Sequence, residues 1–177
     1  MIRWRHVILI VAITGLTTAV SASYENQTYD QTVLDRTIAL NEQGDFQGQF
    51  DTLIAAVQNS DASVAETLND SEANLTVFAP TDDAFSEAGI NPDNVGELSE
   101  EDLTNVLLNH VSEERLLYED LTGRDGVETL YGENITLTNE VITDQTGDES
   151  SIVVANIEAS NGVIHAVDGV VKPYSLG

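Results

Sequence analysis

Two histidines and a pair of adjacent aspartates are the side chains with the most evident chemical potential in this sequence. His110 and His165 lie in the body of the chain, and Asp82 is followed directly by Asp83. Two imidazoles and a carboxylate would supply three of the three or four protein ligands that zinc needs. However, His110 lies on the apolar side of a predicted helix, and His165 alternates with valines in a predicted strand. We therefore expect both histidines to face the core and to hydrogen-bond to backbone.

Motifs for other kinds of chemistry are missing or incomplete. The chain has no cysteine and no Gly-x-Ser-x-Gly nucleophile elbow. Residues 91–102 partly resemble a calcium-binding EF-hand loop, but Val95 occupies a ligand position and Asp102 replaces the long bidentate glutamate. Asp82 and Asp83 fit the first turn of a helix, where the helix dipole favours negative charge. The sequence therefore predicts no catalytic residue, no metal site and no cofactor.

The stretch from residue 75 to residue 85 predicts a buried strand, a sharp stop and a helix. Val77 and Phe78 favour a strand, and Pro80 ends it because proline cannot donate to a sheet ladder. Thr81 is a suitable N-cap for the helix that follows, since its hydroxyl can accept a backbone N–H. This stretch therefore predicts how the two aspartates are positioned.

Helical patterns fill the first part of the chain and strand patterns fill the second. Apolar residues at helical spacing predict helices over 33–39, 46–57, 64–68 and 103–110. Short runs rich in β-branched residues predict strands at 129–131, 135–138, 140–143, 152–157 and 163–171. Asn161-Gly162 predicts a hairpin turn with positive φ at both residues, and the polar stretch 144–150 predicts a mobile loop tip. This order of elements favours an α+β fold.

The charge balance excludes two classes of partner. The chain has six Lys and Arg residues and 31 Asp and Glu residues, which gives a net charge of −25. Such a surface repels nucleic acid and anionic membrane. With Lys172 as the only lysine, the composition resembles that of halophilic proteins, for which salt near 1 M shortens the Debye length to roughly 3 Å. The alternative is an ordinary acidic secreted protein.

The N-terminus predicts a secretion signal over residues 1–22. Arg3 and Arg5 precede an apolar run from residue 7 to residue 13, and Ala22 ends a small-residue cleavage site. An uncleaved anchor is the alternative. Cleavage would leave four basic residues and all 31 acids, a net charge of 4 − 31 = −27. Residues 23–32 are expected to form a short polar linker. We expect a secreted, extracellular or cell-surface protein with no membrane insertion of the mature domain; candidate glycosylation sequons occur at Asn26, Asn69, Asn74 and Asn134.

Three segments, in this order, resemble the signature segments of the fasciclin domain family. They are residues 75–85, residues 107–111 with the central His110, and residues 161–173. The resemblance covers about residues 33–174, which we expect to form a single fasciclin-like domain, with residues 175–177 as a C-terminal tail. The residues that match the family motifs are Thr81, Asp82, Ala84, Phe85, His110, Asn161, Gly162, His165 and Asp168.

The resemblance implies a wedge of short β-strands with a layer of helices packed on it. It also implies a secreted or surface-associated, non-enzymatic adhesion or matrix-type protein that acts through contact with an unknown protein or glycan. Many members carry a tyrosine, tied to integrin adhesion, before the central histidine; here Asn109 weakens that interpretation. We expect the contact surface around residues 80–85 and the helix that carries His110. The alternative is an extracellular binding module for a small apolar ligand or lipid, held in a cleft between the wedge and the helices.

Overall fold

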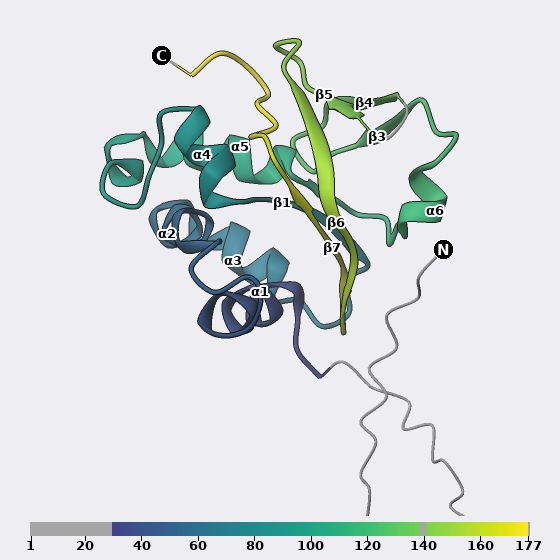
Figure 1. Cartoon of the computed structure of the whole chain (residues 1–177), viewed down its shortest axis with the longest axis horizontal. Helices are drawn as coiled ribbons and strands as arrows, with labels where there is room; N and C mark the ends of the chain where they lie inside the picture. The colour runs from purple at the N-terminus through teal and green to yellow at the C-terminus, as the bar shows by residue number, and fades with distance from the viewer. Residues whose placement is uncertain (1–29, 139–140, 177) are drawn as a thin grey trace, which may run out of the picture.

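Two parallel strands form the centre of the computed structural model, which describes residues 30–138 and 141–176 (Figure 1). β1 (Leu75–Pro80) pairs with β7 (Gly162–Val167), from Leu75 opposite Gly162 to Pro80 opposite Val167. Every residue of both strands is buried. A strand buried on both faces reads as a nearly continuous apolar run, and both of these sequences have that character.

The central pair belongs to a seven-stranded mixed sheet with the order β2-β1-β7-β6-β5-β4-β3. The other strands are β2 (Val111–Ser112), β3 (Gly126–Glu128), β4 (Asn134–Thr138), β5 (Val141–Thr143) and β6 (Glu149–Ala159). β6 joins the two halves, because its first residues pair with β5 and the rest with β7. Two register shifts between Ile152 and Ile157 interrupt that second pairing. Bulges bend a strand and increase its twist, so the sheet turns at β6.

The helices lie mainly on one side of this sheet (Figure 1). They are α1 (Val33–Glu42), α2 (Asp51–Asn59), α3 (Ala62–Leu68), α4 (Asp82–Glu87) and α5 (Glu100–Asn109), with a 3-10 turn, η1 (Val95–Glu97), before α5. The short helix α6 (Tyr118–Leu121) lies on the other side, with β3 to β5. Within the described residues no helix is long and apolar enough to cross a membrane.

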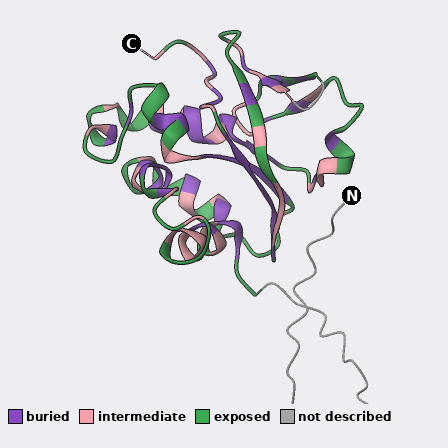
Figure 2. Cartoon of the chain, in the orientation of Figure 1, coloured by how far each residue is buried: buried purple, intermediate pink, exposed green. Residues whose placement is uncertain are grey.

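Successive side chains of β1 point to opposite faces of the sheet and belong to two separate apolar clusters. Val77 and Ala79 belong to the larger cluster, which includes residues of α1 to α5. Phe78 points to the opposite face and belongs to the smaller cluster with residues of β3, β4 and β5. Figure 2 shows the buried residues concentrated in the central strands and on the inner sides of the helices. The sheet is therefore a core layer covered on both faces.

The α+β prediction is confirmed, but several boundaries differ. The helix predicted over 46–57 begins only at Asp51, because Gly48 takes a positive φ angle of 69° and interrupts the helical path. The strand predicted at 129–131 is a turn, with Gly132 at a φ of 93°, and the strand lies earlier at 126–128. The strand predicted to reach residue 171 ends at Val167.

The predicted hairpin forms, with a different reason for its glycine. Ser160 and Asn161 form the turn between β6 and β7, and neither Asn161 nor Gly162 has positive φ. Gly162 instead lies so close to β1 that a Cβ there would be 2.4 Å from the carbonyl oxygen of Leu75. The prediction of a loop tip at 144–150 also needs correction, since Asp144 is buried and Glu149 begins β6. The predicted signal, residues 1–22, lies outside the described residues, as does most of the predicted linker.

Candidate functional site

His110 caps the C-terminal end of α5 with its backbone and joins two distant segments with its ring. Nδ1 lies 2.7 Å from the carbonyl oxygen of Val106, and Nε2 accepts the backbone N–H of Val171 at 2.8 Å. The ring therefore carries its proton on Nδ1. Burial lowers the pKa of His110 from 6.5 to about 4, while the hydrogen bond to Val106 and the nearby Asp144 carboxylate act in the opposite direction. A neutral ring with both nitrogens engaged positions backbone and has no free lone pair for a metal.

Asn109 holds the same distant segment from its other side. Its side-chain amide donates to the carbonyl oxygen of Val171 at 3.2 Å, and its Oδ1 accepts the Thr129 hydroxyl at 3.1 Å. Asn109 is fully buried. Asn109 and His110 thus fix both polar backbone groups of Val171. In the sequence, Asn109 stood out only as a departure from a family tyrosine; its position at the buried end of α5 was the signal for a structural role.

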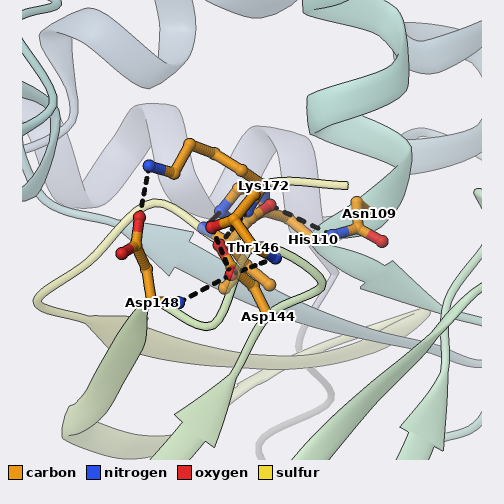
Figure 3. A network of polar contacts seen from close by, with 7 residues as sticks. Asn109, His110, Asp144, Thr146, Asp148 and Lys172 are labelled. Carbon is orange, nitrogen blue, oxygen red and sulfur yellow. Dashed lines mark hydrogen bonds and ion pairs between the residues drawn. The ribbon is translucent and has the colours of Figure 1, made fainter. Parts of the chain in front are cut away.

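Asp144 completes this polar network beside Val171 and Lys172, which follow β7 in the chain (Figure 3). One carboxylate oxygen accepts the backbone N–H groups of Thr146 and Asp148 and the Thr146 hydroxyl, while the other accepts the backbone N–H of Lys172 at 2.8 Å. The Lys172 ammonium pairs with Asp148 and holds the pKa of that carboxyl below its usual value. Asp144 was not among the predicted site residues, although Asp-x-Thr-Gly-Asp is a pattern typical of an aspartate that hydrogen-bonds the backbone of its own turn.

His165 of β7 also bonds backbone groups with both ring nitrogens, on the opposite face of the sheet from the helical layer. Its Nε2 lies 2.9 Å from the carbonyl oxygen of Leu116, and its Nδ1 accepts the backbone N–H of Asn156 at 3.4 Å. The ring stacks on Phe78, with centroids 5.9 Å apart. Burial is the main reason that the pKa of His165 is lowered. Asn156 has a φ of 60°, and its side chain accepts the N–H of Tyr118, so this bulge in β6 also positions α6.

Asn161 and Gly162 bring the start of β7 against α1 and α3. The Asn161 side chain accepts the backbone N–H of Val33 at 2.7 Å and donates to the carbonyl oxygens of Leu68 and Asp70. Its own carbonyl accepts the N–H of Leu75 at 2.9 Å. All of these contacts are to backbone. Asn161 and Gly162 therefore fix where the helical layer meets the sheet.

The first motif performs a similar task at the other end of β1. Thr81 caps α4 through the N–H of Ala84 at 3.4 Å, as predicted. Asp82 accepts the backbone N–H of Thr52 at 2.8 Å and thereby caps α2, whose own N-cap residue makes no side-chain hydrogen bond. Ala84 and Phe85 are buried. A helix N-terminus leaves N–H groups without intrahelical partners, so Asp82 supplies one of them from another helix.

Asp168 is exposed and lies at the end of β7. Its carboxylate accepts the N–H of Ser151 at 2.6 Å, and its own N–H donates to the Ser151 carbonyl at 3.1 Å. This pair of contacts extends the connection between β6 and β7. The nine motif residues thus meet around β1 and β7, and the polar ones among them bind backbone. Among the described residues, no group of three His, Asp or Glu side chains is arranged to hold a metal ion.

The exposed side chains of α4, η1 and α5 are mostly acidic. We call these side chains the outer α4–α5 surface: Asp83, Ser86, Glu87, Glu97, Glu100 and Glu101. Figure 2 shows exposed residues on α4 and on the connection that leads to α5. Any partner that binds here meets carboxylates rather than the motif side chains.

Comparison with known proteins gives consistent matches. The model of the fasciclin domain matches residues 48–173. Transforming growth factor-beta-induced protein ig-h3 of Sus scrofa is 32% identical over 127 residues, which cover 71% of this chain and 18% of that protein. Protein sll1483 of Synechocystis is 31% identical over 137 residues, which cover 70% of this chain and 67% of that protein. The chain thus spans less than a fifth of the first relative and about two thirds of the second.

A solved structure shares the fold. The FAS1 domain pair from the insect cell adhesion molecule fasciclin I aligns with a TM-score of 0.53 and 19% sequence identity, over 66% of this chain and 42% of that one. At this level of identity the likeness shows the fold alone. It agrees with the seven-stranded mixed sheet and the helices packed on it.

Proposed function

The chain belongs to the fasciclin domain family, and from this premise we propose that it is a non-catalytic adhesion or matrix-type protein that binds a protein or glycan at the cell surface. Fasciclin domains are generally non-catalytic binding modules. The solved structure that shares the fold comes from an insect cell adhesion molecule. Secretion of this chain through the predicted signal at residues 1–22 is part of the proposal.

The observation that carries this proposal is the use of the motif side chains inside the fold. The polar side-chain atoms of His110, His165 and Asn161 hydrogen-bond to backbone groups. Asp82 caps a neighbouring helix. Catalysis needs a nucleophile or a general acid or base within reach of a substrate. The motif histidines are buried and engaged, so binding through the outer surface is the function that the arrangement supports best.

We place the contact on the outer α4–α5 surface, which combines the two regions favoured by the sequence. Its carboxylates favour a partner that presents basic or uncharged groups, since like charges across an interface are strongly unfavourable. A basic protein patch or a neutral glycan satisfies this condition. An integrin-type contact that depends on a tyrosine before His110 is not supported, because Asn109 is buried there and bonded to Val171.

We also propose that the acid surplus is an adaptation to high salt. The structure gives ion pairs for only three basic residues in the described chain, Arg115, Arg124 and Lys172. With a net charge of −25, most carboxylates repel one another without a compensating cation. Molar salt screens this repulsion. Thermal unfolding in rising sodium chloride tests the point: a melting temperature that does not rise would contradict adaptation to salt.

Binding to the cells of the source organism tests the main proposal. Purified full-length chain is labelled and added to whole cells and to envelope preparations at low and at molar salt. Saturable binding that is lost after protease or glycosidase treatment of the envelope is expected, and the sensitive treatment identifies the partner as protein or glycan. Absence of saturable binding at every salt concentration, with a folded chain, would overturn the adhesion proposal.

A further inference from the structure

Two half-buried tyrosines meet beside α5. Tyr131 lies in the turn that follows β3, and Tyr174 lies in the segment that follows β7 and passes α5 (Figure 1). Their ring centroids are 6.4 Å apart, with an angle of 57° between the ring planes. Rings tilted in this way do not cover each other's faces as parallel rings do. Since neither side chain is fully buried, part of this aromatic surface is accessible to a ligand.

The ring of Tyr174 is held in place by α5. Its hydroxyl donates to Oδ1 of Asp102 at 2.8 Å and accepts a side-chain N–H of Asn105 at 3.1 Å. Asp102 and Asn105 lie three residues apart, so they share one face of the helix. The Tyr131 hydroxyl, by contrast, makes no hydrogen bond within the part of the chain that the structure describes. One ring is therefore fixed in orientation, and the other presents an unengaged polar end.

The surroundings of the two rings are negatively charged. Hydrogen bonds from Ser99 and Tyr174 hold the pKa of the Asp102 carboxyl below its usual value, so this group is ionised at neutral pH. Glu101 precedes Asp102 in α5, and Glu133 follows the turn that carries the other tyrosine; both glutamates are exposed. A ligand that reaches the rings therefore meets carboxylates.

Aromatic faces and carboxylates together favour a cation. The face of an aromatic ring attracts a cation that lies within about 6 Å of the ring centroid. Because the two centroids are 6.4 Å apart, one cation can lie within this range of both rings. Lys172, the basic residue closest to Tyr174 in sequence, is already paired with Asp148. Among the cations of proteins a guanidinium fits best, since it is planar, stacks on aromatic rings and hydrogen-bonds to carboxylates.

We propose that Tyr131, Tyr174 and Asp102 bind the guanidinium of an arginine on a partner protein. Asp102 directly follows Glu100 and Glu101 of the outer α4–α5 surface, so this site extends the surface on which we place the contact. The inference rests on the proposed function, which supplies the partner, and it adds the chemical group by which that partner is recognised.

Titration of the full-length chain with the peptide acetyl-Gly-Arg-Gly-amide, followed by NMR of the tyrosine ring signals, tests the proposal. The same peptide with citrulline in place of arginine has nearly the same shape and no charge. Both titrations are run in molar sodium chloride, where a Debye length of about 3 Å screens attraction to the rest of the acidic surface. We expect saturable shifts at Tyr131 and Tyr174, and binding of the arginine peptide at least about threefold tighter than that of the citrulline peptide.

Two substitutions at one position provide the control. Tyr131→Leu removes one ring and should weaken binding of the arginine peptide at least about threefold. Tyr131→Phe keeps the ring and removes only a hydroxyl without a hydrogen bond in the described chain, so this variant should bind like wild type. The comparison of the two peptides uses wild type alone and stays decisive if Tyr131→Leu does not fold.

Three results would overturn the proposal: equal binding of both peptides by wild type, equal binding of the arginine peptide by wild type and folded Tyr131→Leu, or ring shifts with maltohexaose and none with the arginine peptide. The last result would assign the site to a neutral glycan. Failure of this inference is distinct from failure of the adhesion proposal. Envelope binding without peptide binding at the rings removes the arginine site alone, whereas peptide binding without envelope binding removes the adhesion proposal and leaves the guanidinium site.

Discussion

Nε2 of His110 accepts the backbone N–H of Val171 across 2.8 Å, although 61 residues separate the two in sequence. The same ring contacts the carbonyl oxygen of Val106 with Nδ1, so one imidazole ties the last turn of α5 to the segment that follows β7. Asn109 binds the carbonyl of Val171 and completes the attachment. Asn109 and His110 therefore connect the helical layer to the segment that follows β7 through buried hydrogen bonds.

Replacing His110 by alanine should destabilise the fold strongly. The change leaves the Val171 N–H and the Val106 carbonyl buried without partners, each at a cost of about 1–3 kcal/mol, and adds a cavity. We expect the free energy of unfolding to fall by about 3 kcal/mol or more in urea titrations. Ser86→Ala, at an exposed position of α4, serves as the control and should stay within about 0.5 kcal/mol. If the free energy of unfolding falls by less than about 1 kcal/mol for His110→Ala, the His110 ring does not connect α5 to Val171 as described.

The lowered pKa of His110 gives the stability of the protein a defined pH dependence. In the unfolded chain the imidazole binds its proton near pH 6.5, whereas in the folded chain it does so near pH 4 because of burial. Between these values the unfolded state binds more protons, so the contribution of His110 is fully present above about pH 6.5 and is lost as the pH falls toward 4. The loss is on the order of 3 kcal/mol, since one pKa unit corresponds to about 1.4 kcal/mol.

Direct titration of the ring separates this effect from that of the acidic surface. Protonation of carboxylates relieves repulsion at low pH and therefore acts with the opposite sign. NMR of the His110 ring carbon in the folded chain should report a midpoint near pH 4. A midpoint near 6.5 in the folded chain would show that the ring is not buried and neutral.

Gly162→Ala should weaken the contact between β7 and β1. The added Cβ would lie 2.4 Å from the Leu75 carbonyl oxygen and 2.9 Å from a methyl carbon of Val33, so strand or helix must move. Overpacking of this kind costs about 1–3 kcal/mol. Gly96→Ala is a matched control, because Gly96 also lacks positive φ and its added Cβ would approach no atom closer than 3.5 Å. Equal melting temperatures for the two variants would contradict this account of Gly162.

Asp82→Ala should cost more stability than Asp83→Ala. Asp82 caps α2 through the N–H of Thr52, whereas the neighbouring Asp83 is exposed in the first turn of α4. Loss of an N-cap typically costs about 1 kcal/mol, and loss of a first-turn charge costs a few tenths. Urea unfolding of the two variants under one salt condition measures the difference. A larger loss at Asp83 would reverse the assignment.

Local patterns predicted what depends on local physics. The stop at Pro80, the cap at Thr81 and the strand character of β1 follow from single-residue preferences, and the structure has them. The long-range contacts were beyond such patterns. Asp82 looked like a residue of its own helix, yet it caps α2, and Gly162 looked like a turn residue, yet it is set by the approach of Leu75. The Asp82 cap arises only when α2 packs beside the start of α4. The Gly162 role arises only when β1 and β7 pair in parallel, a pairing between segments 87 residues apart, from Leu75 to Gly162.

Binding of folded variants to envelope preparations tests the central claim most directly. The claim is that the family-motif side chains hold the fold while the outer α4–α5 surface makes the contact. Full-length wild type, the motif variant Asp82→Ala and the surface variant Glu87→Lys/Glu101→Lys are compared after circular dichroism has shown each to be folded. We predict that the motif variant binds like wild type and that the surface variant binds at least about tenfold more weakly. Loss of binding by the folded motif variant, with unchanged binding by the surface variant, would contradict the account.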